Sequence, residues 1–443
     1  MTVQFVHQSW SRRAFLTAAG SAVSAGTLLA CRQPSEQGGR AAATPVRQIT
    51  LTVAHAWEDA FLPTQEQFDQ EFMKRHPNIR VEFENSVFGE FRAKYAARAA
   101  SGTLPDLLYT QYSWAQEFFR ANIFRNLEPY IAKTRDFNLQ DFTPPSLVAY
   151  RYQGALHLIP YDTGPYLLWY NKDLFDKAGI RYPNENWTMN DMFEAARAIT
   201  RGDGPDRTWG FDSMPGINAL LEPNFLRPFG ASWIDPAETK ITLDSAEIVE
   251  TLTWWLDFRL KHRITPMPEE TRGFERGAWL AGRIGMMIAG SWHAPTASRF
   301  AQFKYDVAHY PRGPKAHITG AAGSGYGITT QSKEPDAAWI YLNEYLSKEG
   351  QEFMWGRSGR GSPSRKSAWA AYESSPLAPP SAKIILPILT SYAEHVRPFG
   401  PMAPEMFSRA GPIWSQALTG QKAIKEALSE IRQVIEPLLA QNR

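Results

Sequence analysis

A strand and a helix alternate along the first part of the chain, and this order restricts the fold more than any other feature. Residues 49–54 have the apolar, β-branched pattern of a buried strand, and two further strands follow over residues 79–83 and 106–109. Between them, residues 63–75 and 91–100 carry apolar side chains at helical spacing. Strands joined by helices pair in parallel, and the helices pack on the faces of the sheet. The sequence therefore predicts an α/β protein built on a mainly parallel sheet.

Aromatic and polar residues directly follow two of these strands. Trp57 and Glu58 come after the first strand, and Tyr112 and Trp114 come after the third. Ligands of such sheets bind outside the carboxyl ends of the strands, so these residues are candidates for a binding site. The chain also has 15 Trp, 17 Tyr and 25 Phe, which suits stacking on sugar rings although most of these rings will be core. Trp57 has an alternative role, because it can instead pack under the following helix.

The N-terminal segment predicts export and attachment to a membrane. A pair of arginines at positions 12 and 13 precedes a weakly apolar run, as in a twin-arginine export signal. Cys31 is the only cysteine and follows Leu-Leu-Ala, the pattern at which bacterial lipoproteins are cut and lipidated. Residues 14–30 are too short and too rich in Ala, Gly, Ser and Thr for a stable transmembrane helix. We therefore expect a signal peptide over residues 1–30, a lipid on Cys31 and a flexible tether over residues 31–47.

Composition excludes several classes of protein. The formal net charge is +2 at pH 7, and residues 1–30 hold two arginines and no acid, so the exported chain is nearly neutral. Such a chain lacks the clustered positive charge that binds nucleic acid. One cysteine leaves no disulfide, and 443 residues exceed what one hydrophobic core usually holds. We therefore expect two packed lobes and no nucleic-acid partner.

Several short blocks of sequence follow one another in a recognisable order. Residues 100–106 read Ala-Ser-Gly-Thr-Leu-Pro-Asp, and residues 158–180 contain Leu-Ile-Pro-Tyr-Asp and then Tyr-Asn-Lys-Asp-Leu-Phe. Residues 274–292 contain Phe-Glu-Arg-Gly, Gly-Met-Met and Gly-Ser-Trp, and residues 320–339 are glycine-rich at first and end in Ala-Ala-Trp. In this order and spacing, the blocks resemble the carbohydrate-type extracellular solute-binding proteins of ABC importers, which are maltose-binding-protein-like.

The resemblance implies a two-lobed, periplasmic-binding-protein-like α/β fold, in which each lobe is a mainly parallel sheet flanked by helices and a hinge joins the lobes. It places one lobe at residues 48–162 and 319–375 and the other at residues 163–318 and 376–443. It implies a monomer that captures a sugar or sugar derivative between the lobes and delivers it to the ABC permease, without cofactor or metal. The expected location is the periplasmic or extracytoplasmic face of the membrane, held by the lipid on Cys31.

The resemblance also adds five candidate ligand-binding residues. Trp292, in Gly-Ser-Trp at a strand end, matches a stacking aromatic of the family, and Trp233 is a second such candidate. Asp162 lies where the chain first crosses between lobes, and its carboxylate can accept hydrogen bonds from two sugar hydroxyls or form a salt bridge at the hinge. Ser324 lies in a glycine-rich stretch where backbone can approach a ligand. Arg360 lies in a basic segment that also matches the family.

Three alternatives remain open at this point. Arg357, Arg360 and Arg365 suit an anionic ligand, such as a sugar acid or a glycerol phosphodiester, unless they belong to a solvated loop. A glycoside-processing enzyme would need two facing carboxylates, for which Glu58 and Asp162 are the candidates. A metal site is not indicated, since the histidines show no i, i+4 pair. We expect a binding protein rather than an enzyme.

Two local signals concern helix ends. Thr188 or Asn190 is expected to cap a helix over residues 191–200. Residues 376–380 and 398–404 are rich in proline, and no helix is expected inside either segment.

Overall fold

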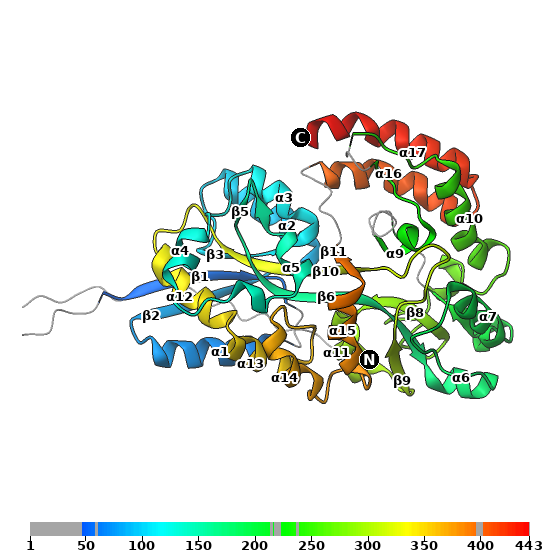
Figure 1. The fold of residues 1–443 in the computed structure, drawn as a ribbon, viewed down its shortest axis with the longest axis horizontal. Coiled ribbons are helices and arrows are strands. Elements are labelled where there is room, and N and C mark those ends of the chain that lie inside the picture. The colour runs from blue at the N-terminus through cyan, green and yellow to red at the C-terminus, as the bar shows by residue number, and fades with distance from the viewer. Residues whose placement is uncertain are drawn as a thin grey trace, which may run out of the picture. The chain divides into compact units, whose positions relative to one another are not determined.

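One mixed sheet organises the protein. The computed structural model describes residues 47–57, 61–212, 216, 223–235, 239–395 and 402–442. Within these residues, the strand order of the nine-stranded sheet is β2-β1-β3-β10-β6-β8-β7, with β11 paired to β10 and β9 paired to β6. Its strands are β1 (Ile49–His55), β2 (Ile79–Asn85), β3 (Leu107–Gln111), β6 (Ile159–Asn171), β7 (Trp209–Phe211), β8 (Ile284–Gly290), β9 (Tyr305–Ala308), β10 (Thr319–Ile328) and β11 (Ala393–His395). Helices lie around both halves of this sheet (Figure 1).

The first half contains the predicted alternation of strands and helices, which is confirmed. β1 pairs in parallel with β2, with Ile49 opposite Ile79, and in parallel with β3, with Val53 opposite Leu107. The side chain of Phe68 on α1 is buried, as the helical spacing of apolar residues predicts. The helices of this half are α1 (Leu62–Arg75), α2 (Phe88–Ala100), α3 (Tyr112–Arg120), α4 (Glu128–Lys133), α12 (Pro335–Tyr345), α13 (Lys348–Ser358) and α14 (Trp369–Glu373).

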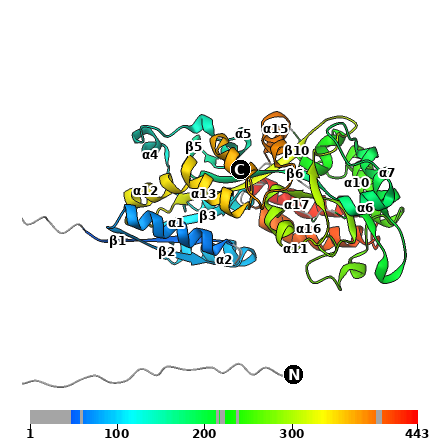
Figure 2. The ribbon, with the colours of Figure 1, turned by 90° about the horizontal axis from the view of Figure 1, so that it is seen from below.

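Two long strands belong to both halves. Residues 159–165 of β6 pair with β10, whereas residues 166–171 pair with β8 and β9. β10 pairs with β3 through residues 324–328 and with β11 through residues 319–321. Figure 1 and Figure 2 both show β6 and β10 running between the half that holds β1 and the half that holds α6 and α7. The two-lobed α/β fold is thus present, and the exact residue boundaries of the lobes remain a prediction.

The second half surrounds the far ends of these strands. Its helices are α6 (Lys172–Ala178), α7 (Met189–Ile199), α9 (Pro223–Leu226), α10 (Ala246–Leu260), α11 (Ala294–Phe300), α16 (Ala403–Leu418) and α17 (Ile424–Leu439). The C-terminal helices α16 and α17 pack on each other, and α17 also contacts α10. Arg432 of α17 donates to the carboxylate of Asp244, just before α10, at 2.7 and 3.0 Å. None of the described helices is both long and apolar enough to span a bilayer.

A third connection follows α14. Residues 374–381 form no helix, in agreement with their proline content, and they lead to α15 (Ile385–Ser391) and β11. Ser381 donates through its backbone N to Asp306 of β9 at 2.8 Å. The second proline-rich segment was predicted wrongly in part, since α16 begins at Ala403. Pro404 lies in the first turn of this helix, where a missing N–H costs nothing.

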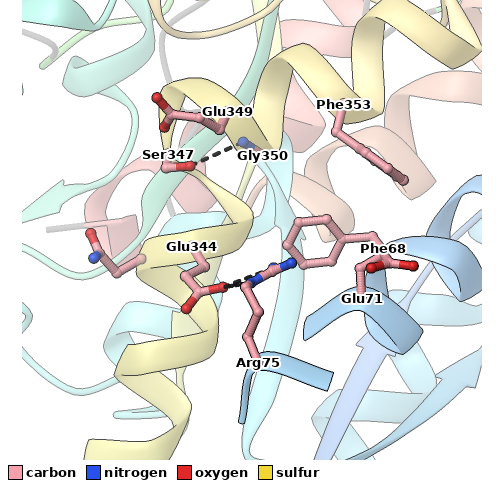
Figure 3. A pocket seen from close by; sticks show the side chains of 9 residues that line it. Phe68, Glu71, Arg75, Glu344, Ser347, Glu349, Gly350 and Phe353 are labelled. Atoms are coloured by element: carbon pink, nitrogen blue, oxygen red, sulfur yellow. Dashed lines mark hydrogen bonds and ion pairs between the residues drawn. The ribbon is translucent and has the colours of Figure 1, made fainter. Parts of the chain in front are cut away.

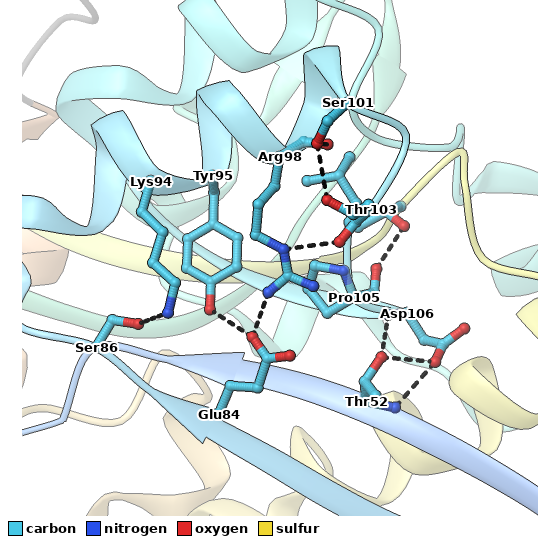
Figure 4. Close-up of polar contacts among 12 residues, drawn as sticks. Thr52, Glu84, Ser86, Lys94, Tyr95, Arg98, Ser101, Thr103, Pro105 and Asp106 are labelled. Carbon is cyan, nitrogen blue, oxygen red and sulfur yellow. Dashed lines mark hydrogen bonds and ion pairs between the residues drawn. The ribbon is translucent and has the colours of Figure 1, made fainter.

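Asp106 braces the first half of the sheet (Figure 4). Its Oδ2 accepts hydrogen bonds from the backbone N and the hydroxyl of Thr52 on β1, at 2.9 and 3.0 Å. Its Oδ1 accepts the hydroxyl of Ser332 at 2.6 Å. Asp106 therefore ties the start of β3 to β1 and to the turn after β10.

Candidate functional site

Three predicted binding residues meet where β6 pairs with β10. Asp162 lies opposite Ser324 in the register of these strands. Its Oδ1 accepts the backbone N and the hydroxyl of Ser324, both at 2.6 Å, and its Oδ2 accepts Nη1 of Arg360 at 3.0 Å. All three residues are buried. A hydrogen-bonded ion pair therefore lies at this point of the sheet, and buried charges are tolerated in this form.

Burial and the polar partners of Asp162 act in opposite directions on its ionisation. Burial raises the pKa of this carboxyl above its ordinary value, and the charge of Arg360 and the hydrogen bonds from Ser324 act in the opposite direction. Both carboxylate oxygens already have donors within the protein. The geometry agrees with the salt-bridge role that the sequence left open for Asp162.

Trp57 lies beside this ion pair. The guanidinium carbon of Arg360 is 4.5 Å from the centre of the Trp57 ring, and the ring of Tyr161 is 5.0 Å away. Asn85 fixes the backbone of Trp57 by accepting from its N at 2.8 Å and donating to its O at 2.9 Å. The indole is buried, and its N–H has no partner among the described residues. The adjacent Glu58 lies outside the described residues, as does Cys31.

The two candidates after β3 are also buried. Trp114, in the first turn of α3, packs between Phe88 and Phe91 with ring centres at 5.3 and 6.4 Å. Tyr112 places its ring 6.3 Å from that of His395 on β11. Sequence reasoning missed Phe88, which is exposed against Trp114. Its place directly after the second strand was the signal that could have found it.

Trp292 differs from the other predicted aromatics because 37% of it is exposed. It lies in a short 3-10 turn that directly follows β8, and the ring of Tyr166 packs edge-on against it at 5.3 Å. A Cβ atom on Gly164 would come within 3.2 Å of the indole, and one on Gly290 within 2.1 Å. The indole therefore lies directly over two glycines of neighbouring strands and keeps a part of its surface open to solvent.

Trp233 lies in a different segment of the second half, between α9 and α10. Its ring is buried, and its carbonyl accepts the backbone N of Thr242 at 2.8 Å. The structure thus gathers Asp162, Ser324, Arg360 and Trp57 in one cluster and places Trp233 outside it.

Two serines that the sequence analysis did not select complete the region. Ser291 and Ser362 place their hydroxyl oxygens 2.6 Å apart, and both side chains are buried. Ser291 precedes Trp292, and Ser362 follows Arg360 by two residues. The pattern gave no signal for this contact, because the two serines are 71 residues apart.

A pocket of about 490 Å³ lies elsewhere, between α1 and the junction of α12 and α13 (Figure 3). Two of its charged groups already face each other, since Arg75 donates to Glu344 at 2.9 Å. Glu71, at its edge, accepts Lys74 at 2.8 Å. Among the residues that the structure describes, no three His, Cys, Asp or Glu side chains gather where they could share a metal ion.

Comparisons with known proteins point in one direction. A family model described as bacterial extracellular solute-binding protein matches residues 56–352. A binding protein of Brucella abortus is 25% identical over 321 residues, covering 68% of this chain and 72% of that protein. The mannitol-binding protein of Pseudomonas aeruginosa is 23% identical over 415 residues, covering 87% and 92%. An ABC substrate-binding protein of Listeria monocytogenes, solved in complex with cycloalternan, has a TM-score of 0.80 at 22% identity and covers 89% of this chain and 99% of that one.

Proposed function

The chain belongs to the bacterial extracellular solute-binding protein family, and from this membership we propose that it captures a carbohydrate between its two lobes and delivers it to the permease of an ABC importer. The relatives named for mannitol and cycloalternan bind a sugar alcohol and an oligosaccharide, which supports a carbohydrate ligand here. The protein acts as a monomer without cofactor, and it performs no chemistry on the ligand.

Trp292 is the observation that carries this proposal. An indole that is 37% exposed at a strand end offers an apolar face, and sugar rings stack on such faces through their C–H groups. Tyr166 packs against the indole, and the indole lies on Gly164 and Gly290. The side chain is therefore already held in position, so little conformational entropy is lost when a ligand binds. The side chains of Trp57, Tyr112, Trp114 and Trp233 are buried, so their contact with a ligand requires a rearrangement of the surrounding loops.

A neutral ligand is favoured over an anionic one. The anionic alternative rested on three arginines, and each of them has a partner within the chain. Arg357 donates to Gln67 at 2.7 Å, Arg360 to Asp162 at 3.0 Å and Arg365 to Asp141 at 3.3 Å. Recruiting Arg360 to a carboxylate or phosphate ligand would leave the buried carboxylate of Asp162 without its cation, which is costly.

A binding role is also favoured over glycoside processing. Asp162 would have to serve as one of two facing carboxylates, but Ser324 and Arg360 occupy both of its oxygens. Export by the twin-arginine route and a lipid on Cys31 complete the proposal, and both rest on the sequence of residues 1–47. They hold the protein on the outer face of the cytoplasmic membrane or in the periplasm, near the permease.

Calorimetric titration tests the function directly. We expect at least one neutral sugar or sugar alcohol to bind, in a screen that also includes sugar acids and glycerol phosphodiesters, and we expect no product by chromatography. Trp292→Ala should weaken binding by about 1–3 kcal/mol, the usual contribution of a stacking aromatic. Trp187→Ala, at a half-buried tryptophan that precedes the N-cap of α7, is the matched control and should leave affinity unchanged.

Two outcomes would count against the proposal. Turnover of a glycoside by the purified protein would make it an enzyme. Equal affinity of the Trp292→Ala variant and the unaltered protein would remove Trp292 from the site.

A further inference from the structure

Two segments from different halves of the protein meet along β6. The segment after α13 runs beside the start of β6, where Thr163 donates its backbone N to the carbonyl of Ser362 at 3.1 Å and Asp162 forms a bridge with Pro363. β8 runs beside the later part of β6 and ends with Gly290 opposite Tyr166. The 360–363 segment of the first half and the end of β8 in the second half therefore meet at residues 164 and 165.

Only glycine fits at this junction. A Cβ atom at position 164 would lie 2.2 Å from Oγ of Ser291 and 3.2 Å from the indole of Trp292. A real Cβ atom does not approach other atoms so closely, so the space above Gly164 belongs to these two side chains. Because Gly164 on β6 has no side chain, the hydroxyl of Ser291 can reach the hydroxyl of Ser362.

The contact between the two serines is the direct side-chain link across this junction. Their oxygens are 2.6 Å apart, and Ser291 and Ser362 are 0% and 1% exposed. Water cannot replace either partner in so closed a place, so removal of one hydroxyl leaves the other without its bond. The link joins the residue before Trp292 to a loop of the other half.

The same loop also contacts Trp57. Arg360, two residues before Ser362, lies over the Trp57 ring and donates to Asp162. The 360–362 segment thus contacts the indole of Trp57 at one end and Ser291, the residue before Trp292, at the other. Its length and conformation set the position of one aromatic ring relative to the other.

We propose that Ser362 is a positioning residue for ligand binding, which fixes Trp292 relative to Trp57 by its hydrogen bond to Ser291. The proposal rests on the function proposed above, because it concerns the same site. Ser362 does not touch the ligand. It holds the turn that presents the Trp292 indole, so its loss leaves the indole in place but less well fixed.

The test compares two serines of one loop. Ser362→Ala removes the link. Ser364→Ala is the matched control, because Ser364 is equally buried and, among the described residues, its hydroxyl bonds only to Gln351 and Pro160, at 2.7 Å each. We expect Ser362→Ala to weaken binding of the sugar found in the screen by about tenfold, as loss of one buried hydrogen bond does. Ser364→Ala should lower the melting temperature without changing the dissociation constant.

A second readout does not need the ligand. With 5-fluorotryptophan incorporated, the ¹⁹F resonance of Trp292 can be assigned by its loss in Trp292→Phe. Ser362→Ala should shift and broaden this resonance, and Ser364→Ala should not. Ser291→Ala tests the same bond from the other side, and the double variant Ser291→Ala/Ser362→Ala should bind no more weakly than either single variant.

The outcomes separate the two proposals. An unmoved Trp292 resonance in both Ser362→Ala and Ser291→Ala, or equal loss of affinity in Ser362→Ala and Ser364→Ala, would overturn the positioning role. A shifted resonance in a protein for which no sugar binds would support the positioning of Trp292 and refute the proposed function.

Discussion

At the scale of single residues, Asp69 is an ionisable group whose burial has a consequence near neutral pH. Burial raises the pKa of this carboxyl to about 7, while hydrogen bonds from Tyr341 at 2.6 Å and Gln65 at 3.0 Å oppose the rise and the charge of Glu66 adds to it. Its second oxygen has no partner among the described residues. The folded protein therefore holds a proton here that an unfolded chain releases near pH 4.

The sign of the effect follows from this difference in proton binding. Between about pH 4 and pH 7 only the folded state keeps the proton of Asp69, so the free energy of unfolding falls as the pH rises through this window. Because Asp69→Asn cannot ionise, we expect its free energy of unfolding not to show this fall. Relative to the unaltered protein, the variant should therefore gain stability between pH 5 and pH 8. Urea unfolding of both proteins at the two pH values measures the difference in their free energies of unfolding. Glu71→Gln, at a partly exposed residue of the same helix, is the control, and an unchanged dependence of stability on pH in Asp69→Asn would contradict the expectation.

At the scale of elements, helix α7 shows how far local sequence reaches. Thr188 and Asp191 form a reciprocal capping box, in which the hydroxyl of Thr188 accepts the backbone N of Asp191 at 3.2 Å and Asp191 accepts the backbone N of Thr188 at 2.8 Å. The sequence left Thr188 and Asn190 as alternatives, and Thr188 is the cap. All the atoms involved lie within four residues, so no distant contact is needed to choose between them.

Loss of this cap should destabilise the protein measurably. Thr188→Ala leaves a backbone N–H of the first turn without its acceptor, and we expect a loss of about 1 kcal/mol in the free energy of unfolding. Thr390→Ala, at an exposed threonine in the last turn of α15, has no cap to lose and should change stability by much less. Denaturant unfolding of both variants decides the matter, and similar losses in the two would show that the capping box contributes nothing.

The glycine-rich strand β10 has a structural role that the sequence alone did not indicate. The glycines suggested a close approach of backbone to a ligand. A Cβ atom on Gly323 would instead lie 2.2 Å from the carbonyl O of Asp162 on β6. The missing side chain lets two strands of the sheet approach each other, and this requirement appears only when both strands are in place.

At the scale of the whole molecule, the proposed function requires that the protein stays near its permease. The tether of residues 31–47 would connect the described body to the membrane through Cys31. Each buried methylene of a lipid chain contributes about 0.8 kcal/mol, so two acyl chains retain a protein of this size at the bilayer.

Removal of the thiol should release the protein. We expect Cys31→Ser, expressed in a bacterial host with twin-arginine export, to leave the washed membrane fraction while keeping its sugar affinity. Ser35→Ala, four residues away in the tether, should remain with the membrane. Immunoblots of the fractions, together with the mass of the N-terminal peptide, give the answer, and a Cys31→Ser protein that stays with the membrane would exclude the lipid anchor.

The sequence by itself determined what depends on neighbours along the chain. It predicted the strands and helices of the first half and the parallel pairing of β1 with β2 and β3, and it limited the cap of α7 to Thr188 or Asn190, because hydrophobic period and capping act over a few residues. The order of its short blocks also pointed to the family. Most of the α/β architecture could be predicted in this way.

Only the tertiary structure decided which candidate residues face solvent and which face one another. Asp162 and Arg360 are 198 residues apart, and the sequence left a ligand contact and a structural role open for each of them, whereas folding joins them in one buried pair. Trp57 and Trp292 both follow strands, yet one is buried under Arg360 and the other is partly exposed over Gly164. Burial and charge pairing depend on every segment that packs around a side chain, and no local pattern contains that information.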